Sequence, residues 1–199
     1  SGWQGCNLTE INGGKCNTEE DFYKACRAAS ILGTLQAGYT DFKFLTDTSK
    51  LIFDREALLG VSITGWMNNP DILFDQKILE KGAKIVKEVN REVAQIIGIN
   101  PAARTTCVKP SGNASVLLQT ASGIHAEHSN MYIRNVQMNK ESEITQAIMK
   151  TNPYMVEESV WSSTGTDVVV SFPILPKKGS MYKDDLLGIK HLELVKKAQ

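Results

Sequence analysis

A long helical pattern between two short strand patterns constrains the fold of this chain most. Over residues 73–97 the apolar side chains recur every three or four positions, with Lys and Glu between them, which is the period of an amphipathic helix. Residues 58–65 alternate larger apolar residues with Gly, Ser and Thr, and residues 104–108 read as a second strand. Gly98 and Pro101 mark the end of the helix. This order predicts an α/β fold with mainly parallel strands and flanking helices.

Strand and helix patterns continue to alternate along the rest of the chain. Thr18 and Asp21 form a capping-box pattern that predicts a helix start, and Pro173 is expected to end a strand. Further strands are predicted at 6–11, 131–138 and 168–172, and further helices at 19–36, 115–118, 141–150 and from Asp184 onward.

The composition allows a sizeable buried core, because 42% of the 199 residues are hydrophobic. The 22 basic and 22 acidic residues cancel, whereas a duplex-binding surface normally needs a basic excess. No apolar run reaches the ~20 residues of a membrane span, and the start of the chain does not resemble a signal peptide. The sequence therefore predicts a cytoplasmic protein with neither nucleic acid nor membrane as a partner.

The four cysteines form no C-x-x-C pair, so reduced thiols are expected rather than a disulfide framework or a metal knuckle. Cys26 lies on the apolar face of a predicted helix, and Cys107 lies in a predicted strand. Both are expected in the core. Cys16 follows a Gly-Gly-Lys turn and could be exposed, and Cys6 begins a strand.

Residues 109–115 read as the end of a strand, a tight turn and the start of a helix. Pro110 favours an extended residue before it, Gly112 exposes bare backbone, and Ser111 or Asn113 can cap the helix. The first turn of a helix leaves N–H groups without internal partners, and with the helix dipole these groups attract anions. The serine hydroxyls would add donors. The candidate phosphate-binding residues are Ser111, Gly112, Asn113, Ala114 and Ser115.

The same residues would also suit an ordinary capped helix, and no G-K-[S/T] of a Walker loop occurs. His125, Glu127 and His128 could suggest a metal site further on. The two histidines are three residues apart in a predicted loop, whereas zinc sites on a helix favour a spacing of four. With no evident third ligand, we predict no metal, and a polar rim or a structural loop is the alternative.

Three segments taken together resemble the catalytic chain of ribonucleotide reductases, most closely the class II, adenosylcobalamin-dependent type. Residues 6–12, Cys-Asn-Leu-Thr-Glu-Ile-Asn, resemble the family strand that bears the second redox cysteine. Residues 55–66 resemble a Gly-rich barrel strand. Residues 108–136, with Pro-Ser-Gly-Asn-Ala-Ser and Ser-Gly-Ile-His, resemble the substrate-phosphate loop and the segment after it.

The resemblance implies that residues 1–199 are a single partial domain, the second half of a ten-stranded α/β barrel. It implies an oxidoreductase that makes deoxyribonucleotides by thiyl-radical chemistry, with a ribonucleoside di- or triphosphate as substrate. An external dithiol such as thioredoxin would be the reductant. Adenosylcobalamin, a cobalt cofactor, is implied by the family alone, because no ligand for it is identifiable here.

The resemblance also assigns residue roles, with Cys6 as a reducing cysteine. The family's radical cysteine lies in Asn-Pro-Cys-x-Glu, which this sequence lacks. We expect that motif and the other reducing cysteine upstream of Ser1, in the missing N-terminal half of the barrel. The chain alone should then be inactive, and Cys6 should be a free thiol. Gly123, Ile124 and His125 are candidate residues of the active-site rim.

Two other interpretations stay open. In one, the chain is the docking half of a split reductase and acts only after binding a separate N-terminal half. In the other, it is an unrelated phosphate-binding α/β protein that shares the loop by chance.

Overall fold

The computed structural model describes residues 2–109 and 111–199. Ser1 lies outside the described residues, and so does Pro110, which belongs to the predicted phosphate loop. Two compact units are present. The first runs to Glu127 and resumes at Lys177, and the second is His128–Pro176. The single partial domain over residues 1–199 stays a prediction.

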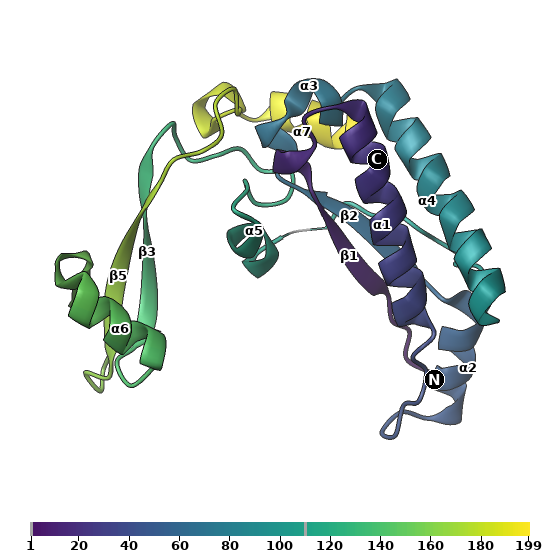
Figure 1. Ribbon diagram of the computed structural model, residues 1–199, viewed down its shortest axis with the longest axis horizontal. Coiled ribbons are helices and arrows are strands. Elements are labelled where there is room, and N and C mark those ends of the chain that lie inside the picture. Colours follow the sequence, from purple (N-terminus) through teal and green to yellow (C-terminus); the bar gives the residue numbers. More distant parts are fainter. Residues whose placement is uncertain (1, 110) are drawn as a thin grey trace. The chain divides into compact units, whose positions relative to one another are not determined.

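The first unit is built on two parallel strands, as the alternating patterns predicted. In β1 (Asn7–Asn12) and β2 (Leu59–Thr64) the residues pair in order, from Asn7 opposite Leu59 to Asn12 opposite Thr64. Helices α1 (Glu19–Ala37) and α4 (Gln76–Ile97) cover one side of this sheet (Figure 1). The strand-helix-strand pattern thus places a two-stranded sheet against a helical layer.

The predicted strand at 104–108 forms only one isolated bridge, between Thr106 and Val61. Hydrogen bonds on either side keep it parallel to β2: the Val61 N–H donates to the Thr105 carbonyl and the Cys107 N–H donates to the Val61 carbonyl, each at 3.0 Å. The segment therefore lies along the edge of β2, opposite β1.

The predicted helix at 73–97 is interrupted. Helix α3 (Pro70–Leu73) ends first, and α4 starts afresh because the Asp75 carboxylate accepts hydrogen bonds from the N–H groups of Lys77 and Ile78. The capping box that starts α1 is confirmed. The remaining helices of the first unit are α2 (Asp47–Glu56), α5 (Asn113–Leu118) and α7 (Ile189–Ala198). Near Asp184 the chain forms only a 3-10 turn, and α7 begins five residues later than expected.

The core of the first unit lies between the sheet and the helical layer. Ile11 of β1 and Val61 and Ile63 of β2 pack with Phe22 of α1 and Val86 of α4, and none of the five is more than 8% exposed. Burying such a side chain contributes about 1.5–3 kcal/mol. This layer fixes one face of the sheet against α1 and α4.

The chain leaves and re-enters the first unit at neighbouring points. The Glu127 N–H donates to the Met181 carbonyl at 3.0 Å, and the Lys183 N–H donates to the Glu127 carbonyl at 2.9 Å. The buried Asn68 amide donates to both the Glu127 carboxylate (3.0 Å) and the Ser180 hydroxyl (2.9 Å). These bonds hold together the two segments of the first unit that precede and follow the second unit.

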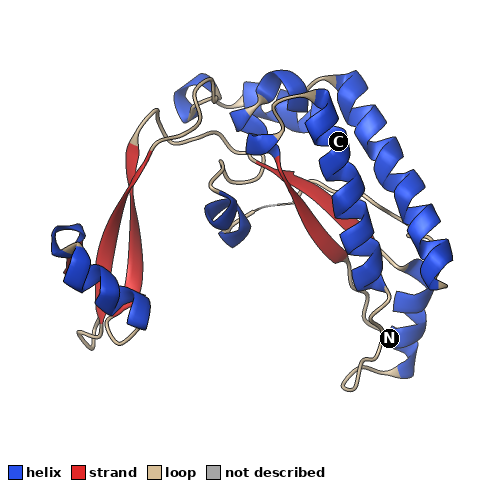
Figure 2. Cartoon of the chain, in the orientation of Figure 1, coloured by secondary structure: helices blue, strands red, loops and turns tan. Residues whose placement is uncertain are grey.

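The second unit is an antiparallel sheet with one helix, α6 (Glu143–Thr151) (Figure 2). Its strands β3 (Tyr132–Asn139), β4 (Val156–Glu158) and β5 (Asp167–Ile174) lie in the order β3-β5-β4. The expectation of mainly parallel strands is therefore wrong for this unit. Pro173 does not end β5, because it lies opposite Ile133 within the register.

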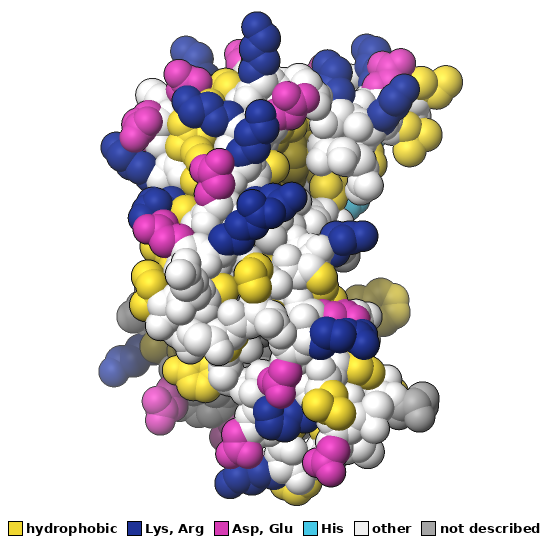
Figure 3. All heavy atoms as spheres, turned by 90° about the vertical axis from the view of Figure 1, so that its right-hand side faces the viewer, with side chains coloured by type: hydrophobic (Ala, Val, Ile, Leu, Met, Phe, Trp, Pro, Cys, Tyr) yellow, Lys and Arg dark blue, Asp and Glu magenta, His cyan; other side chains and the backbone are white. Residues whose placement is uncertain are grey.

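The α/β class is confirmed, whereas the ten-stranded barrel stays a prediction, since the described residues form five strands. Viewed from the side of α4, Lys and Arg side chains are interspersed with Asp and Glu, and neither sign dominates this face (Figure 3). Among residues 2–109 and 111–199, none of the helices combines the length and apolar character that a membrane crossing requires.

Candidate functional site

One face of the β1–β2 sheet is turned away from α1 and α4, and we call it the open face. Leu8 lies opposite Gly60 and Glu10 lies opposite Ser62, and strand alternation directs these positions away from the core. A Cβ atom built on Gly60 would lie 2.9 Å from Cys6 Sγ and 3.1 Å from Cys107 Sγ. Both thiols therefore belong to the open face, above the one residue of β2 that has no side chain.

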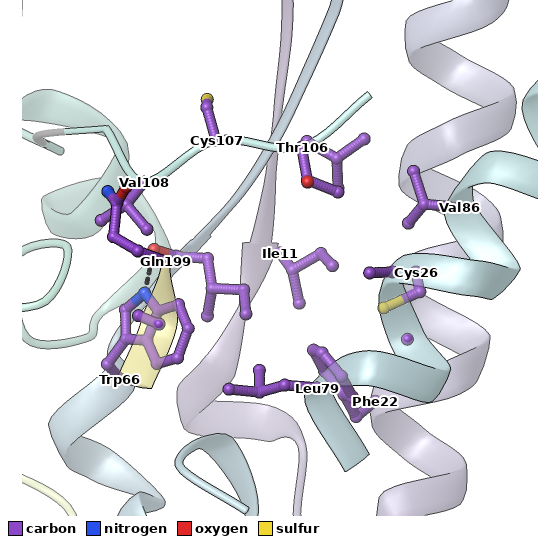
Figure 4. A pocket seen from close by; sticks show the side chains of 15 residues that line it. Ile11, Phe22, Cys26, Trp66, Leu79, Val86, Thr106, Cys107, Val108 and Gln199 are labelled. Atoms are coloured by element: carbon purple, nitrogen blue, oxygen red, sulfur yellow. Dashed lines mark hydrogen bonds between the residues drawn. The ribbon is translucent and has the colours of Figure 1, made fainter. Parts of the chain in front are cut away.

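Cys107 was expected in the core and is instead an exposed residue. In Figure 4 its side chain points away from Ile11, Val86 and Cys26. Cys16, for which the sequence left exposure open, is buried, with 2% of its surface exposed, and Cys26 is in the core as predicted. All four cysteines are free thiols.

Partial burial raises the pKa of the Cys6 thiol, and neighbouring Cys107 raises it further. Burial also raises the pKa of Cys107, an effect that Lys109 opposes and Glu10 reinforces. Deeper burial raises the pKa of Cys16 to about 11 and that of Cys26 to about 12. Because the thiolate is the nucleophile, all four should be less reactive at neutral pH than an ordinary cysteine.

We expect iodoacetamide to alkylate Cys6 and Cys107 in the folded protein long before Cys16 and Cys26. The rate at Cys6 and Cys107 should rise about tenfold per pH unit from neutral pH and continue to rise above pH 9.0, the ordinary thiol value. Mass spectrometry of digests taken over a pH series measures each site, with the denatured protein as control. Early labelling of Cys16, or a plateau below pH 8 at Cys6, would contradict the geometry.

Polar groups without partners lie in the middle of the open face. Lys109 Nζ is 3.3 Å from Glu10 Oε2, and both side chains are largely buried. Among the residues that the structure describes, Glu10 Oε1, Asn12 Oδ1 and Ser62 Oγ are buried without a hydrogen-bond partner. Such atoms are uncommon and call for an explanation such as an absent ligand. Three of them lie on this one sheet face, which therefore has unmet hydrogen-bonding capacity.

The predicted phosphate loop leads into α5, whose N-cap is Gly112 without a side-chain capping bond. Ser111 Oγ accepts a hydrogen bond from the Ser115 N–H at 3.1 Å, and Ser115 Oγ donates to the Gly112 carbonyl at 2.7 Å. Both serines are 3% exposed. The Ser115 hydroxyl therefore donates within the turn, whereas Ser111 Oγ caps the Ser115 N–H, as the sequence predicted for Ser111. That these hydroxyls also donate to phosphate stays a prediction. Gly112 and Asn113 are exposed and Ala114 is half-buried.

The segment after α5 ties this loop to the open face. Thr64 Oγ1 accepts a hydrogen bond from the Gly123 N–H at 2.9 Å and donates to the Ala121 carbonyl at 3.2 Å. Gly123 has φ +53°, and a Cβ there would lie 3.3 Å from the Lys109 carbonyl and the Ser111 nitrogen. A glycine is required by this close approach and by the backbone angle.

The candidate rim residues have different environments. Ile124 is 8% exposed and belongs to the core, whereas Gly123 lies against the loop. His125 is exposed, and its ring centroid is 5.5 Å from that of His191. His191 Nε2 lies 3.0 Å from the Ile124 carbonyl oxygen, so α7 supports this segment. The roles of these residues, of Cys6 and of residues 111–115 stay predictions.

The sequence reasoning missed the polar residues of the open face. Glu10, Asn12 and Ser62 were expected only as parts of strands, and Lys109 as the residue before a proline. Alternation along residues 6–12 places Cys, Leu, Glu and Asn on one face, and this signal could have identified Glu10 and Asn12.

The opposite face of the sheet borders an apolar cavity of about 370 Å³. Ile11, Val86 and Leu79 converge on it, and Trp66 closes one side with its indole N–H donating to the Ile63 carbonyl (Figure 4). Among the described residues that line the cavity, none has a buried side-chain polar atom without a partner, so the open face is the better candidate for chemistry.

No protein-family model matches this chain. The probable adenosylcobalamin-dependent ribonucleoside-triphosphate reductase of Dictyostelium discoideum is 29% identical over 87% of this chain and 23% of its own length. The adenosylcobalamin-dependent ribonucleoside-triphosphate reductase of Euglena gracilis is 26% identical over 85% of this chain and 23% of its own length. That of Lactobacillus acidophilus is 24% identical, with 84% and 27% covered.

A crystal structure of a B12-dependent (class II) ribonucleotide reductase matches the fold with a TM-score of 0.73, at 16% identity, over 90% of this chain and 29% of that protein. The chain thus spans about a quarter of the length of the curated relatives that it matches. Matches over most of the chain, in sequence and in fold, do not suit an unrelated protein with a chance loop. The chain is homologous to one segment of the adenosylcobalamin-dependent ribonucleotide reductases, which confirms the resemblance found in its motifs.

Proposed function

We propose that this chain is part of a ribonucleotide reductase, to which it contributes a reducing cysteine and the loop that binds the substrate's phosphates. The observation that carries the proposal is the open face, which has the Cys6 thiol beside Gly60 and residues 111–115 beyond Thr64. Four residue steps along β2, roughly 13 Å, separate Gly60 from Thr64. A ribose with its phosphate chain, lying along β2, would reach both ends. The names of the relatives support this chemistry.

In the proposed reaction, two thiols supply two electrons and two hydrogens to the ribonucleotide. They become a disulfide while the 2′-hydroxyl leaves as water. Cys6 would be one of these thiols, and its position at the start of a paired strand would hold it in place. The second reducing thiol and the radical cysteine would come from parts of the enzyme outside these 199 residues, which lack Asn-Pro-Cys-x-Glu. An external dithiol such as thioredoxin would reopen the disulfide by exchange.

Adenosylcobalamin is the proposed cofactor, because the curated relatives are named as dependent on it. When bound, it would supply the radical that starts the reaction. The described residues offer no group of three or more His, Cys, Asp or Glu side chains that could hold a metal ion. We therefore assign no residue of this chain to the cofactor.

The remainder of the barrel is the proposed protein partner. Within the part of the chain that the structure describes, β1 pairs with β2 alone, so its other edge carries backbone groups that another strand could pair with. Leu8, at 48% exposure on the open face, would then be covered. A cytoplasmic location is part of the proposal, because the chemistry needs thiols that are kept reduced.

The loop would bind phosphate through backbone N–H groups at the start of α5. Gly112 and Asn113 are exposed, and a Cβ on Gly112 would meet nothing within 4 Å, so an oxyanion can approach the backbone there. The Ser115 N–H is already satisfied by Ser111. Ser111 and Ser115 would thus shape the loop, while Gly112, Asn113 and Ala114 would provide its donors.

We expect Asn113→Asp to weaken nucleotide binding about fivefold or more, because a carboxylate at the first residue of α5 repels phosphate. The same charge should slightly stabilise the helix, by about 0.3–1 kcal/mol through the dipole. A titration of the protein with a ribonucleoside triphosphate, followed by NMR of the amides of residues 112–115, measures the binding.

Asn130→Asp makes the same change at an exposed position of the second unit and should leave binding unaltered. An equal loss of nucleotide affinity in both variants would show that the added net charge, and not its position at α5, weakens binding. Amide shifts elsewhere, with none in residues 112–115, would contradict the phosphate assignment.

A further inference from the structure

The Cys6 and Cys107 thiols form a pair that the proposed reaction does not need. Their sulfurs lie 2.9 and 3.1 Å from the same point, the Cβ position of Gly60, so they are no more than about 6 Å apart. Cys6 immediately precedes β1, and Cys107 follows the isolated bridge at Thr106. The two thiols therefore reach over β2 from opposite sides and meet where that strand has no side chain.

We propose that Cys6 and Cys107 are a dithiol site that closes to an intramolecular disulfide when a small-molecule disulfide oxidises it. One thiolate attacks the oxidant and releases one thiol, which leaves a mixed disulfide on the protein. The second cysteine then attacks that mixed disulfide and releases the other thiol. Overall, two protein thiols and one external disulfide give one protein disulfide and two external thiols.

Either thiol can attack first, because burial raises the pKa of both. At Cys107 the Lys109 ammonium opposes this rise and Glu10 adds to it, and at Cys6 the neighbouring Cys107 adds to it. Both residues are exposed, so an oxidant of the size of glutathione disulfide can reach them, whereas Cys16 and Cys26 are 2% exposed.

Closure requires movement, since the sulfurs must approach to about 2.05 Å and the Cα atoms must come within about 7 Å. Cys6 lies outside β1, and Cys107 lies outside any named strand. Cys6 can shift ahead of β1, whereas movement of Cys107 would cost the hydrogen bond from its N–H to the Val61 carbonyl (3.0 Å) but leave the β1–β2 register intact. The inference is independent of the proposed function, because it needs only the folded chain and an oxidant.

The test is oxidation of the purified protein with glutathione disulfide, followed by trypsin under non-reducing conditions. Each cysteine falls in a different tryptic peptide, because Lys109 precedes a proline and is not cleaved: residues 1–15, 16–24, 25–27 and 105–134. We expect peptide 1–15 linked to peptide 105–134, with the intact mass lowered by two hydrogens. Cys6→Ser and Cys107→Ser should each abolish the link and leave the remaining thiol as a stable glutathione adduct.

A second measurement does not depend on variants. Phenylarsine oxide bridges only paired thiols, and one equivalent should protect Cys6 and Cys107 together from alkylation in the wild-type protein. The proposal would be overturned by glutathione adducts on both cysteines without a link, by a link to peptide 16–24 or 25–27, or by the absence of oxidation.

Discussion

Cys6→Ser should reduce deoxyribonucleotide formation to background, a loss on the order of 10³-fold or more, as is typical when one member of a cooperating catalytic set is removed. Serine has nearly the same shape but cannot give up electrons to form a disulfide, so the two-electron reduction of the ribose has no complete donor. The measurement is product formation by a reductase reconstituted from this chain and the portion of a relative that carries Asn-Pro-Cys-x-Glu.

Nucleotide binding by the Cys6→Ser protein should be unchanged, because the proposed phosphate donors are backbone N–H groups of Gly112, Asn113 and Ala114. The matched control is Cys26→Ala, which also removes a thiol but from the core, where Cys26 is 2% exposed. Once corrected for folded protein, its activity should stay near wild type. Substantial turnover by Cys6→Ser would exclude Cys6 as a reducing cysteine.

Gly65→Ala should cost about 3 kcal/mol or more in the free energy of unfolding of the first unit. Gly65 has φ +77°, and an added Cβ would lie 2.7 Å from Thr120 Cβ and 2.9 Å from Asn68 Oδ1. The left-handed backbone contributes about 1–2 kcal/mol, and displacing buried neighbours about 1–3 kcal/mol more. Asn68 Oδ1 also accepts a hydrogen bond from the Ala121 N–H at 2.8 Å, so the loop support would shift too.

Gly98→Ala separates these two contributions. Gly98 ends α4 with φ +75°, and a Cβ there would meet nothing within 4 Å. It should therefore cost only the backbone strain, about 1–2 kcal/mol. Urea denaturation followed by far-UV circular dichroism compares both variants with wild type. An equal loss of unfolding free energy in the two variants would show that the neighbours of Gly65 move aside without an energetic cost.

Local patterns were sufficient where neighbours in sequence determine the structure. The alternation of β1 and β2, the period of α4 and the capping box of Thr18 and Asp21 involve residues a few positions apart, and all are found in the structure. They also sufficed to find the resemblance to ribonucleotide reductases, because the motifs that carry it are continuous stretches.

Burial and pairing depend on residues far away in sequence, and there the predictions failed. Cys107 was predicted in the core because it lies in the predicted strand at 104–108. The face of the sheet on which its side chain lies depends on β2, which is more than 40 residues earlier in the sequence. For Cys16 the sequence left exposure open, and in the structure it is covered and its thiol donates to the Asn12 carbonyl at 3.4 Å. The Ser115 hydroxyl was predicted only as a donor to phosphate, because the sequence does not show that the turn brings it within 2.7 Å of the Gly112 carbonyl, to which it donates.

The hydrogen bonds that join Glu127 to Met181 and Lys183 have a consequence for modularity. Residues 128–176 are an insertion into the first unit, and the hydrogen bonds of Glu127 join the chain just before the insertion to the chain just after it. Loop-closure entropy grows only with the logarithm of loop length, so this segment can lengthen, shorten or be exchanged at little cost to the fold that carries the open face. The second unit is thus the part of the chain that can change while the open face of the first is retained.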